Sequence, residues 1–332
     1  MTAPEAPFVT VLTPVYNGED YLAECIESVL KQKYQNFEYI IVNNCSTDRS
    51  LAIAQEYATK DRRIRVHTNE RFVEVIDNHN IAFGLVAARA KYCKVVSADD
   101  LIFPDCISQM VELAEKNPAI GFVGAYQLSG GCVKWQGFSY PQQIFNGLEI
   151  GRWILSQRQS FVDGQPVFGF GSPTSLLYRA DLLRRWVKYF PNPSPHSDTS
   201  AGLRDLAHCD FGFLYQILSF ERLHQKTQSS KSIEMNGQAS AYLSDLIDYG
   251  SFYFDAAERR SKISSALREY QRYLAINLFR SRDKTFWDYH KGRLQELGYP
   301  LARWTLFKAA VAVTLEAALN PGRVARRIWK RV

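Results

Sequence analysis

The sequence predicts an α/β protein with a mostly parallel sheet and a helical C-terminal extension. In the first 130 residues, short apolar runs alternate with helical patterns, as repeated β-α-β units require. Two adjacent carboxylates, Asp99 and Asp100, follow one of these runs, and open α/β sheets bind ligands at such strand ends. Residues 238–298 and 301–319 carry helical apolar patterns.

Three runs near the N-terminal end predict parallel strands, which span residues 9–12, 37–42 and 64–67. Asn17, with Asp20 three residues later, predicts the capped start of a helix after the first strand. Ser46 or Thr47 predicts the cap of the helix after the second strand.

The alternation continues with a helix over 80–90, a strand over 92–96, a helix from Pro104 to about 116 and a strand over 120–126. From 130 to about 195 the chain is rich in Gly, Pro and aromatic residues, which predicts loops that line a site. A helical apolar run is expected after Asp210.

Composition is that of a folded protein, with 332 residues, 46% of them apolar and 22% charged. The six cysteines form no C-x-x-C pair, so reduced thiols in the cytoplasm are expected. Residues 1–7 lack the features of a secretory signal, and no run of apolar residues is long enough to predict a membrane span.

Net charge is +6, but residues 321–332 hold five Arg and Lys residues and no acid. The rest of the chain is therefore close to neutral, which argues against a nucleic-acid-binding face on it.

Four polar segments are expected at the carboxyl ends of predicted strands, and they span 13–17, 43–48, 97–100 and, further along the chain, 208–212 with Asp210. Carboxyl ends of parallel strands share one edge of a sheet, so these segments are expected to meet there. Adjacent carboxylates at a buried strand end repel each other unless a cation lies nearby. A divalent metal that holds a diphosphate would satisfy this requirement at Asp99 and Asp100.

At these segments the chain resembles the family-2 glycosyltransferases, which have the Rossmann-like GT-A fold. The resemblance rests on PVYNGEDYLAECIESVLKQKYQNFEYIIVNNCSTDRS, on Ser97-Ala98-Asp99-Asp100 and, more weakly, on Asp210. It covers about residues 8–225. It implies a nucleotide-sugar-binding part over 1–130 and an acceptor-binding part of the same domain over 131–237. The last hundred residues match no known family, and their helical apolar pattern predicts a C-terminal extension over 238–332.

The resemblance also implies roles. Asp99 and Asp100 would bind Mg²⁺ or Mn²⁺ against the diphosphate of a sugar nucleotide, with a UDP-sugar favoured. Asp210 would be the general base for a direct, inverting attack by a hydroxyl of a glycan or lipid-linked acceptor in bacterial surface-polysaccharide synthesis. The residues implied to contact the nucleotide are Thr13, Pro14, Val15, Tyr16, Asn17, Asn44, Ser46, Asn78, Ser97, Ala98 and Asp99.

The chain departs from the family pattern at two places. Asn43-Asn44-Cys45 stands where the family has Asp-Asp-Gly, which leaves the nucleotide base open, because an amide can donate as well as accept. Ser97 stands where the family has the first acid of its metal motif, so only two carboxylates remain and modest metal affinity is expected.

Alternatives remain open. Asp99 and Asp100 can simply start a helix, Asp210 can be structural, and Arg179 can reach a phosphate or form a surface ion pair. A nucleotidyltransferase would need a Gly-rich phosphate loop after the first strand, and a nicotinamide oxidoreductase would need G-x-G-x-x-G; neither occurs here. An inactive sugar-nucleotide-binding protein stays possible.

The C-terminal segment allows three interpretations. Residues 301–331 combine an apolar helix with a basic end, so they can lie on the inner face of an anionic membrane, pack on the body, or form a homodimer contact.

Overall fold

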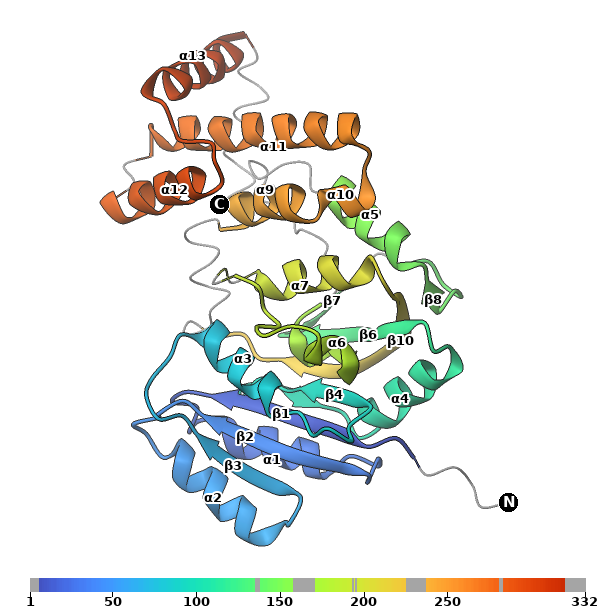
Figure 1. Cartoon of the computed structure of the whole chain (residues 1–332). Helices are drawn as coiled ribbons and strands as arrows, with labels where there is room; N and C mark the ends of the chain where they lie inside the picture. Colours follow the sequence, from blue (N-terminus) through green and yellow to red (C-terminus); the bar gives the residue numbers. More distant parts are fainter. Residues whose placement is uncertain are drawn as a thin grey trace. The chain divides into compact units, whose positions relative to one another are not determined.

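The computed structural model describes residues 6–134, 138–157, 171–192, 194, 196–224, 237–280 and 283–319. The chain divides into two compact units, one spanning 1–151 with 168–227 and the other spanning 152–167 with 228–332. Figure 1 shows strands in the first unit and helices alone in the labelled part of the second.

The first unit contains one sheet. Its strands are β1 (Val9–Val15), β2 (Phe37–Asn43), β3 (Ile64–Thr68), β4 (Tyr92–Val95), β5 (Leu101–Ile102), β6 (Ile120–Ser129), β7 (Cys132–Lys134), β8 (Ile144–Phe145), β9 (Leu176–Arg179) and β10 (Asp210–Glu221). Their order is β3-β2-β1-β4-β9-β6-β10-β5, with β7 beside β6 and β8 beside β10.

Most of the long strands are parallel. β1 pairs in parallel with β2 and β4, β2 with β3, and β6 with β10. β9 is antiparallel to both of its neighbours, β4 and β6, so it joins two parallel groups that run in one direction. The carboxyl ends of β1, β2, β4 and β10 therefore lie along one edge of the sheet, called the carboxyl edge below; the opposite edge is the amino edge.

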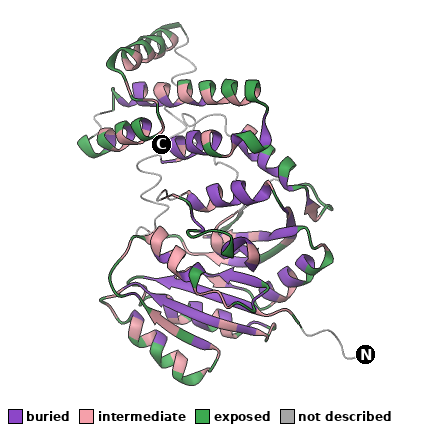
Figure 2. Cartoon of the chain, viewed as in Figure 1, coloured by how far each residue is buried: buried purple, intermediate pink, exposed green. Residues whose placement is uncertain are grey.

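Helices pack around this sheet. They are α1 (Leu22–Leu30), α2 (Ser50–Lys60), α3 (Val75–Gly84), α4 (Cys106–Lys116), the start of α5 (Gly147–Gln157), the 3₁₀ turn η1 (Pro173–Ser175), α6 (Ala180–Arg184) and α7 (Ser197–Leu206). Every residue of β1 is buried, which fits a parallel strand covered on both faces. Figure 2 shows the same burial through the central strands.

The structure confirms the predicted α/β class and corrects several elements. The third helix begins at Val75 and ends at Gly84, not over 80–90. α1 and α2 have no side-chain cap: Asn17, Ser46 and Thr47 lie in the preceding loops and bond to one another.

Residues 211–221 form most of strand β10, whereas a helix was expected after Asp210. Phe211 and Phe213 are fully buried and stack on the same side, with ring centroids 6.5 Å apart. This spacing of two residues is the strand period, and it is hidden in the sequence because Leu214, Ile217 and Leu218 add an apolar pattern that also fits a helix.

The second unit contains the expected C-terminal helices. They are the end of α5, then α9 (Gln238–Asp248), α10 (Gly250–Tyr253), α11 (Ala256–Asn277), α12 (Lys284–Glu296) and α13 (Arg303–Leu319). The Asp255 carboxylate accepts hydrogen bonds from Ala257 N and Glu258 N, so it caps α11, the longest of them. Over the described residues, none of the helices is both long and apolar enough to cross a membrane.

Candidate active site

Two loops at the carboxyl edge are tied together. Asn17 N donates to Ser46 Oγ (3.1 Å), and the Asn17 side-chain oxygen accepts from Thr47 N (2.8 Å). Gly18 N and Glu19 N donate to Ser50 Oγ and the Asp48 carboxylate. The loops that follow β1 and β2 therefore form one wall, and Asn17 and Ser46 build it.

Two residues of this wall have a left-handed backbone conformation. Asn17 and Cys45 both have positive φ, at 50° and 55°. Asparagine tolerates this conformation, whereas a cysteine rarely adopts it. Cys45 is held by its thiol, which donates to Asn69 O, so a side chain occupies the position where the family has glycine.

The predicted nucleotide contacts at the end of β1 and directly after it divide into buried and exposed residues. Thr13, Pro14 and Val15 are buried, and the Thr13 hydroxyl bonds to Val96 O (2.8 Å) beneath the site. Tyr16 is 47% exposed. Of the four, only Tyr16 is exposed.

Asn44 and Asn78 support a second loop from behind. The Asn44 amide donates to Val73 O (2.8 Å) and accepts from Val73 N (3.0 Å), so both main-chain polar groups of Val73 are bonded to this side chain. Asn69 Nδ2 donates to both Asn44 Oδ1 and Asn78 Oδ1, at 2.9 Å each. With Asn44 only 1% exposed, its side chain positions the chain rather than facing outward.

This network brings an aromatic residue to the wall that sequence reasoning missed. Phe72 lies against Tyr16 with ring centroids 4.8 Å apart, and both rings are about half exposed. The available signal was a lone aromatic residue in a polar segment directly after β3.

The two carboxylates have different environments. Asp100 is 4% exposed; its Oδ2 lies 2.7 Å from the Thr174 hydroxyl, and its Oδ1 accepts from Arg222 N (3.2 Å). Burial, followed by the charge of Asp99, raises the pKa of Asp100 to about 7. Asp99 keeps about a third of its side chain exposed.

A buried lysine supports Asp100 from below. Lys94 lies in β4 with no exposed surface, and its ammonium donates to Leu176 O (3.0 Å) and Thr174 O. Burial lowers the pKa of Lys94. Lys94 thereby holds η1 and the start of β9 in place, and Thr174 in η1 in turn contacts Ser97 and Asp100.

The segment that follows β10 brings a histidine to Asp99. His224 Nε2 lies 3.0 Å from Asp99 Oδ2. Arg222 fixes this segment, because its Nε donates to Asp99 O (3.2 Å) and its guanidinium pairs with Glu24 (2.6 Å). Sequence reasoning missed His224 because the preceding strand was taken for a helix.

A carboxylate and an imidazole are both ligands that Mn²⁺ accepts. Among the residues that the structure describes, no group of three or more His, Cys, Asp or Glu side chains is arranged to hold a metal ion. The residues present therefore supply only part of a metal coordination shell. Asp99 and His224 would bind the metal, with Asp100 behind them, and oxygens of a substrate and of water would fill the remaining positions.

Ser97 and Ala98 are the other two residues of the acidic loop, which spans 97–100. Ser97 N donates to the Thr174 hydroxyl oxygen (3.0 Å). A Cβ placed on Gly18 would lie 3.6 Å from Ala98 Cβ, so the acidic loop reaches the first wall. The structure therefore brings together Tyr16, Asn17, Asn44, Ser46, Asn78, Ser97, Ala98, Asp99 and Asp100 at the carboxyl edge.

Asp210 does not join this group. It is the first residue of β10 and pairs with Ile120 at the start of the parallel strand β6, on the amino edge. Its Oδ1 accepts from Gly147 N (3.3 Å), at the start of α5. β10 runs beside β6 from Ile120 to Ser129 before it reaches the segment that contacts Asp99. At about 3.3 Å per residue, this length of β6 places the two acids roughly 30 Å apart. The expectation that Asp210 shares an edge with Asp99 is therefore wrong.

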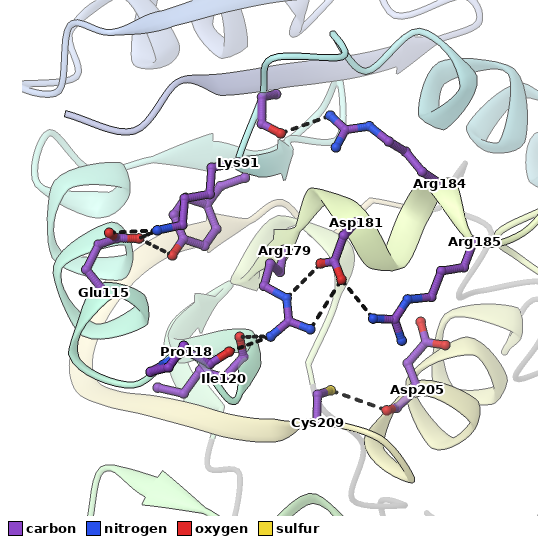
Figure 3. A network of polar contacts seen from close by, with 12 residues as sticks. Lys91, Glu115, Pro118, Ile120, Arg179, Asp181, Arg184, Arg185, Asp205 and Cys209 are labelled. Atoms are coloured by element: carbon purple, nitrogen blue, oxygen red, sulfur yellow. Dashed lines mark hydrogen bonds and ion pairs between the residues drawn. The ribbon is translucent and has the colours of Figure 1, made fainter. Parts of the chain in front are cut away.

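Arg179 is also used at the amino edge. It pairs with Asp181 (2.7 Å) and donates to Pro118 O and Ile120 O. Figure 3 shows this network, in which Arg185 and Lys91 also pair with acids. Of the two interpretations of Arg179, the ion pair holds.

Comparison with known proteins places the chain in a family. The model of glycosyl transferase family 2 matches residues 10–186, more than half of the chain. GlyG of Streptococcus pneumoniae is 33% identical over 118 residues, which are 36% of this chain and 38% of GlyG. The putative teichuronic acid biosynthesis glycosyltransferase TuaG of Bacillus subtilis is 35% identical over 119 residues, 36% of this chain and 46% of TuaG. These alignments span less than half the length of either relative.

Solved structures share the fold. TarS 1–349 of S. aureus in complex with UDP-GlcNAc has a TM-score of 0.60 and 17% identity, covering 87% of this chain and 80% of that one. The mannosyltransferase PcManGT of Pyrobaculum calidifontis, in complex with GDP-Man and Mn²⁺, has a TM-score of 0.53 and 16% identity, covering 93% and 87%. On the family match, together with a GT-A-like sheet, the chain belongs to glycosyltransferase family 2.

Proposed function

We propose that the protein transfers a sugar, with inversion, from a nucleotide-diphosphate sugar to a hydroxyl of a glycan or lipid-linked acceptor in bacterial surface-polysaccharide synthesis. The observation that carries the proposal is the carboxyl edge, where a half-exposed aromatic pair lies on one side and Asp99 with His224 on the other. TuaG, named for teichuronic acid biosynthesis, supports the pathway class.

The nucleotide base is proposed to stack on Tyr16 and Phe72. Exposed aromatic rings provide a flat apolar surface for a base without selecting its edge. Because the Asn44 amide is already bonded to both main-chain groups of Val73, base selection falls to main-chain groups of the two loops. UDP is favoured, since TarS was solved with UDP-GlcNAc.

Asp99 and His224 are proposed to hold Mg²⁺ or Mn²⁺ against the diphosphate, with Asp100 close behind. A metal bound there neutralises charge that develops on the leaving diphosphate. PcManGT, solved with Mn²⁺, supports a metal in this fold. Thr174 and Arg222 orient the acidic loop through their bonds to Asp100.

The acceptor hydroxyl needs a base, and Asp210 is too distant to serve. We assign this role to Asp198, a partly exposed carboxylate in the first turn of α7. Asp198 lies at the opposite end of α7 from the turn that leads to Asp210. Burial, followed by the charge of Asp198, raises the pKa of Tyr178 on β9.

Thermal stabilisation by nucleotides tests the site. We expect UDP to raise the melting temperature with Mn²⁺ present and to act weakly without it, as ligand linkage requires; GDP, dTDP and CMP serve as comparison nucleotides. His224→Gln should raise the Mn²⁺ concentration needed for this effect about tenfold.

His208→Gln is the matched control, because His208 is exposed near the amino edge. A nucleotide effect that ignores Mn²⁺, or one equally metal-dependent in His224→Gln, would contradict the proposed metal site. Metal-dependent binding without turnover on any acceptor would favour an inactive binding protein.

A further inference from the structure

Helix α13 is apolar on two faces. One face packs on α11, where Arg272 pairs with Glu316 at 2.6 Å. The partly buried residues of α13 lie toward this contact, among them Leu306, Ala310 and Val313.

The other face is apolar and exposed. Trp304 is 63% exposed and Leu319 is 78% exposed, and the residues between them recur at steps of three or four. At 100° per residue these positions fall on one side of the helix, in a stripe about 22 Å long at 1.5 Å per residue. Figure 2 shows exposed residues recurring along α13. This exposed stripe consists of Trp304, Phe307, Val311, Leu315 and Leu319.

The start of the exposed stripe combines aromatic rings with a cation. Trp304 and Phe307 stack with centroids 5.4 Å apart, and the Lys308 ammonium lies 5.4 Å from the Trp304 ring. Aromatic side chains beside a lysine suit the boundary between lipid headgroups and acyl chains.

The sequence directly after α13 is cationic. Residues 320–332 hold Arg323, Arg326, Arg327, Lys330 and Arg331 and no acid. A second copy of the chain packed in parallel along the exposed stripe would bring two such cationic sequences together, which like-charge repulsion opposes. An anionic lipid surface attracts the same charges.

We propose that the exposed stripe of α13 docks the protein on an anionic membrane surface, which also attracts the cationic sequence that follows Leu319. The apolar side chains enter the headgroup boundary, with Lys308 beside them at the start of the stripe. The proposal does not depend on which sugar or nucleotide the enzyme uses.

Flotation with vesicles tests the docking surface. The full-length protein should float with vesicles of phosphatidylcholine and phosphatidylglycerol, and should float weakly with phosphatidylcholine alone. The variant Trp304→Gln, Phe307→Gln, Leu315→Gln should lose at least about tenfold in partition, since apolar area and charge both contribute. The variant Arg323→Gln, Arg326→Gln, Arg327→Gln should lose binding to the anionic vesicles selectively.

Phe279→Gln is the matched control, because Phe279 is an exposed aromatic residue outside α13. Circular dichroism and nucleotide-induced stabilisation check that each variant is folded. If the apolar variant does not fold, the charge variant still tests the proposal. Equal flotation of wild type and both variants would overturn the proposal. So would a dimer that the apolar variant disrupts, without any vesicle binding by the wild type.

Discussion

At the residue scale, Asp99 and Asp100 are neighbours in sequence but have different exposure and different partners. Asp99 is partly exposed and faces His224, whereas Asp100 is buried and is bonded to Thr174 and to Arg222 N. A buried carboxylate beside a second acid is an energetic cost for the folded protein, so Asp100 is retained at the expense of stability.

This cost predicts a pH dependence. The pKa of Asp100 is about 7 in the folded protein and near 3.8 in the unfolded chain. The folded state therefore binds the proton more tightly, and the contribution of Asp100 to stability falls as pH rises from the lower value to the higher one. With a chelator present, raising the pH from about 5 to 7 should cost the wild type about 2 kcal/mol through this residue.

Urea unfolding of wild type and Asp100→Asn across that range measures the effect. As the pH rises, the wild type should lose stability relative to Asp100→Asn, because asparagine does not titrate. A difference that is constant with pH would show that Asp100 is ionised throughout.

The two candidate base residues make opposite predictions. Asp198→Asn should lower kcat by a factor on the order of 10² to 10⁴, as loss of a general base does, with nucleotide binding intact. Asp210→Asn should keep turnover and lose about 1 kcal/mol of stability, because its carboxylate accepts from Gly147 N at the start of α5. Turnover assays and thermal unfolding of both variants decide between them; an inactive Asp210→Asn protein with normal stability would reverse the assignment.

At the scale of elements, different contacts hold the carboxyl edge and the amino edge of the sheet. Loops at the carboxyl edge are tied by side chains to main-chain groups, and they leave Tyr16 and Phe72 exposed. At the amino edge, α5 begins so close to the turn before β10 that no side chain fits at Gly147. A Cβ there would lie 1.8 Å from Cys209 O and 2.3 Å from Leu206 O.

Gly147→Ala should therefore be strongly destabilising, by about 2–4 kcal/mol, because backbone must move to admit the methyl group. Gly84→Ala is the control, since Gly84 also lies in a helix and a Cβ there meets nothing within 4 Å. Thermal unfolding compares the two variants. Equal melting temperatures would mean that α5 shifts freely against the start of β10.

At the scale of the whole molecule, the sequence predicted the regular parts well. Strands β1, β2 and β4 were visible because a strand buried on both faces is a continuous apolar run. The strand ends then placed Tyr16, Ser97 and Asp99 on one edge. The C-terminal helices were visible through their apolar period.

The rest depended on contacts between residues distant in sequence. Thr174 reaches Asp100, and His224 reaches Asp99, across 74 and 125 positions, and no local pattern reports such a contact. Asp210 was misplaced because a motif gives the residue type but not the direction of the strand that carries it. β10 was mistaken for a helix because its apolar residues fit both periods.

The antiparallel strand β9 also has a consequence for how the enzyme forms during synthesis. Residues 92–100 leave the ribosome well before residues 174–179, which supply the neighbour of β4 and the hydroxyl beside Asp100. Until then β4 is an open edge strand, able to pair with another nascent chain. A fragment of the first 130 residues would contain both aspartates but not their anchor, so it is expected to aggregate rather than to bind nucleotide.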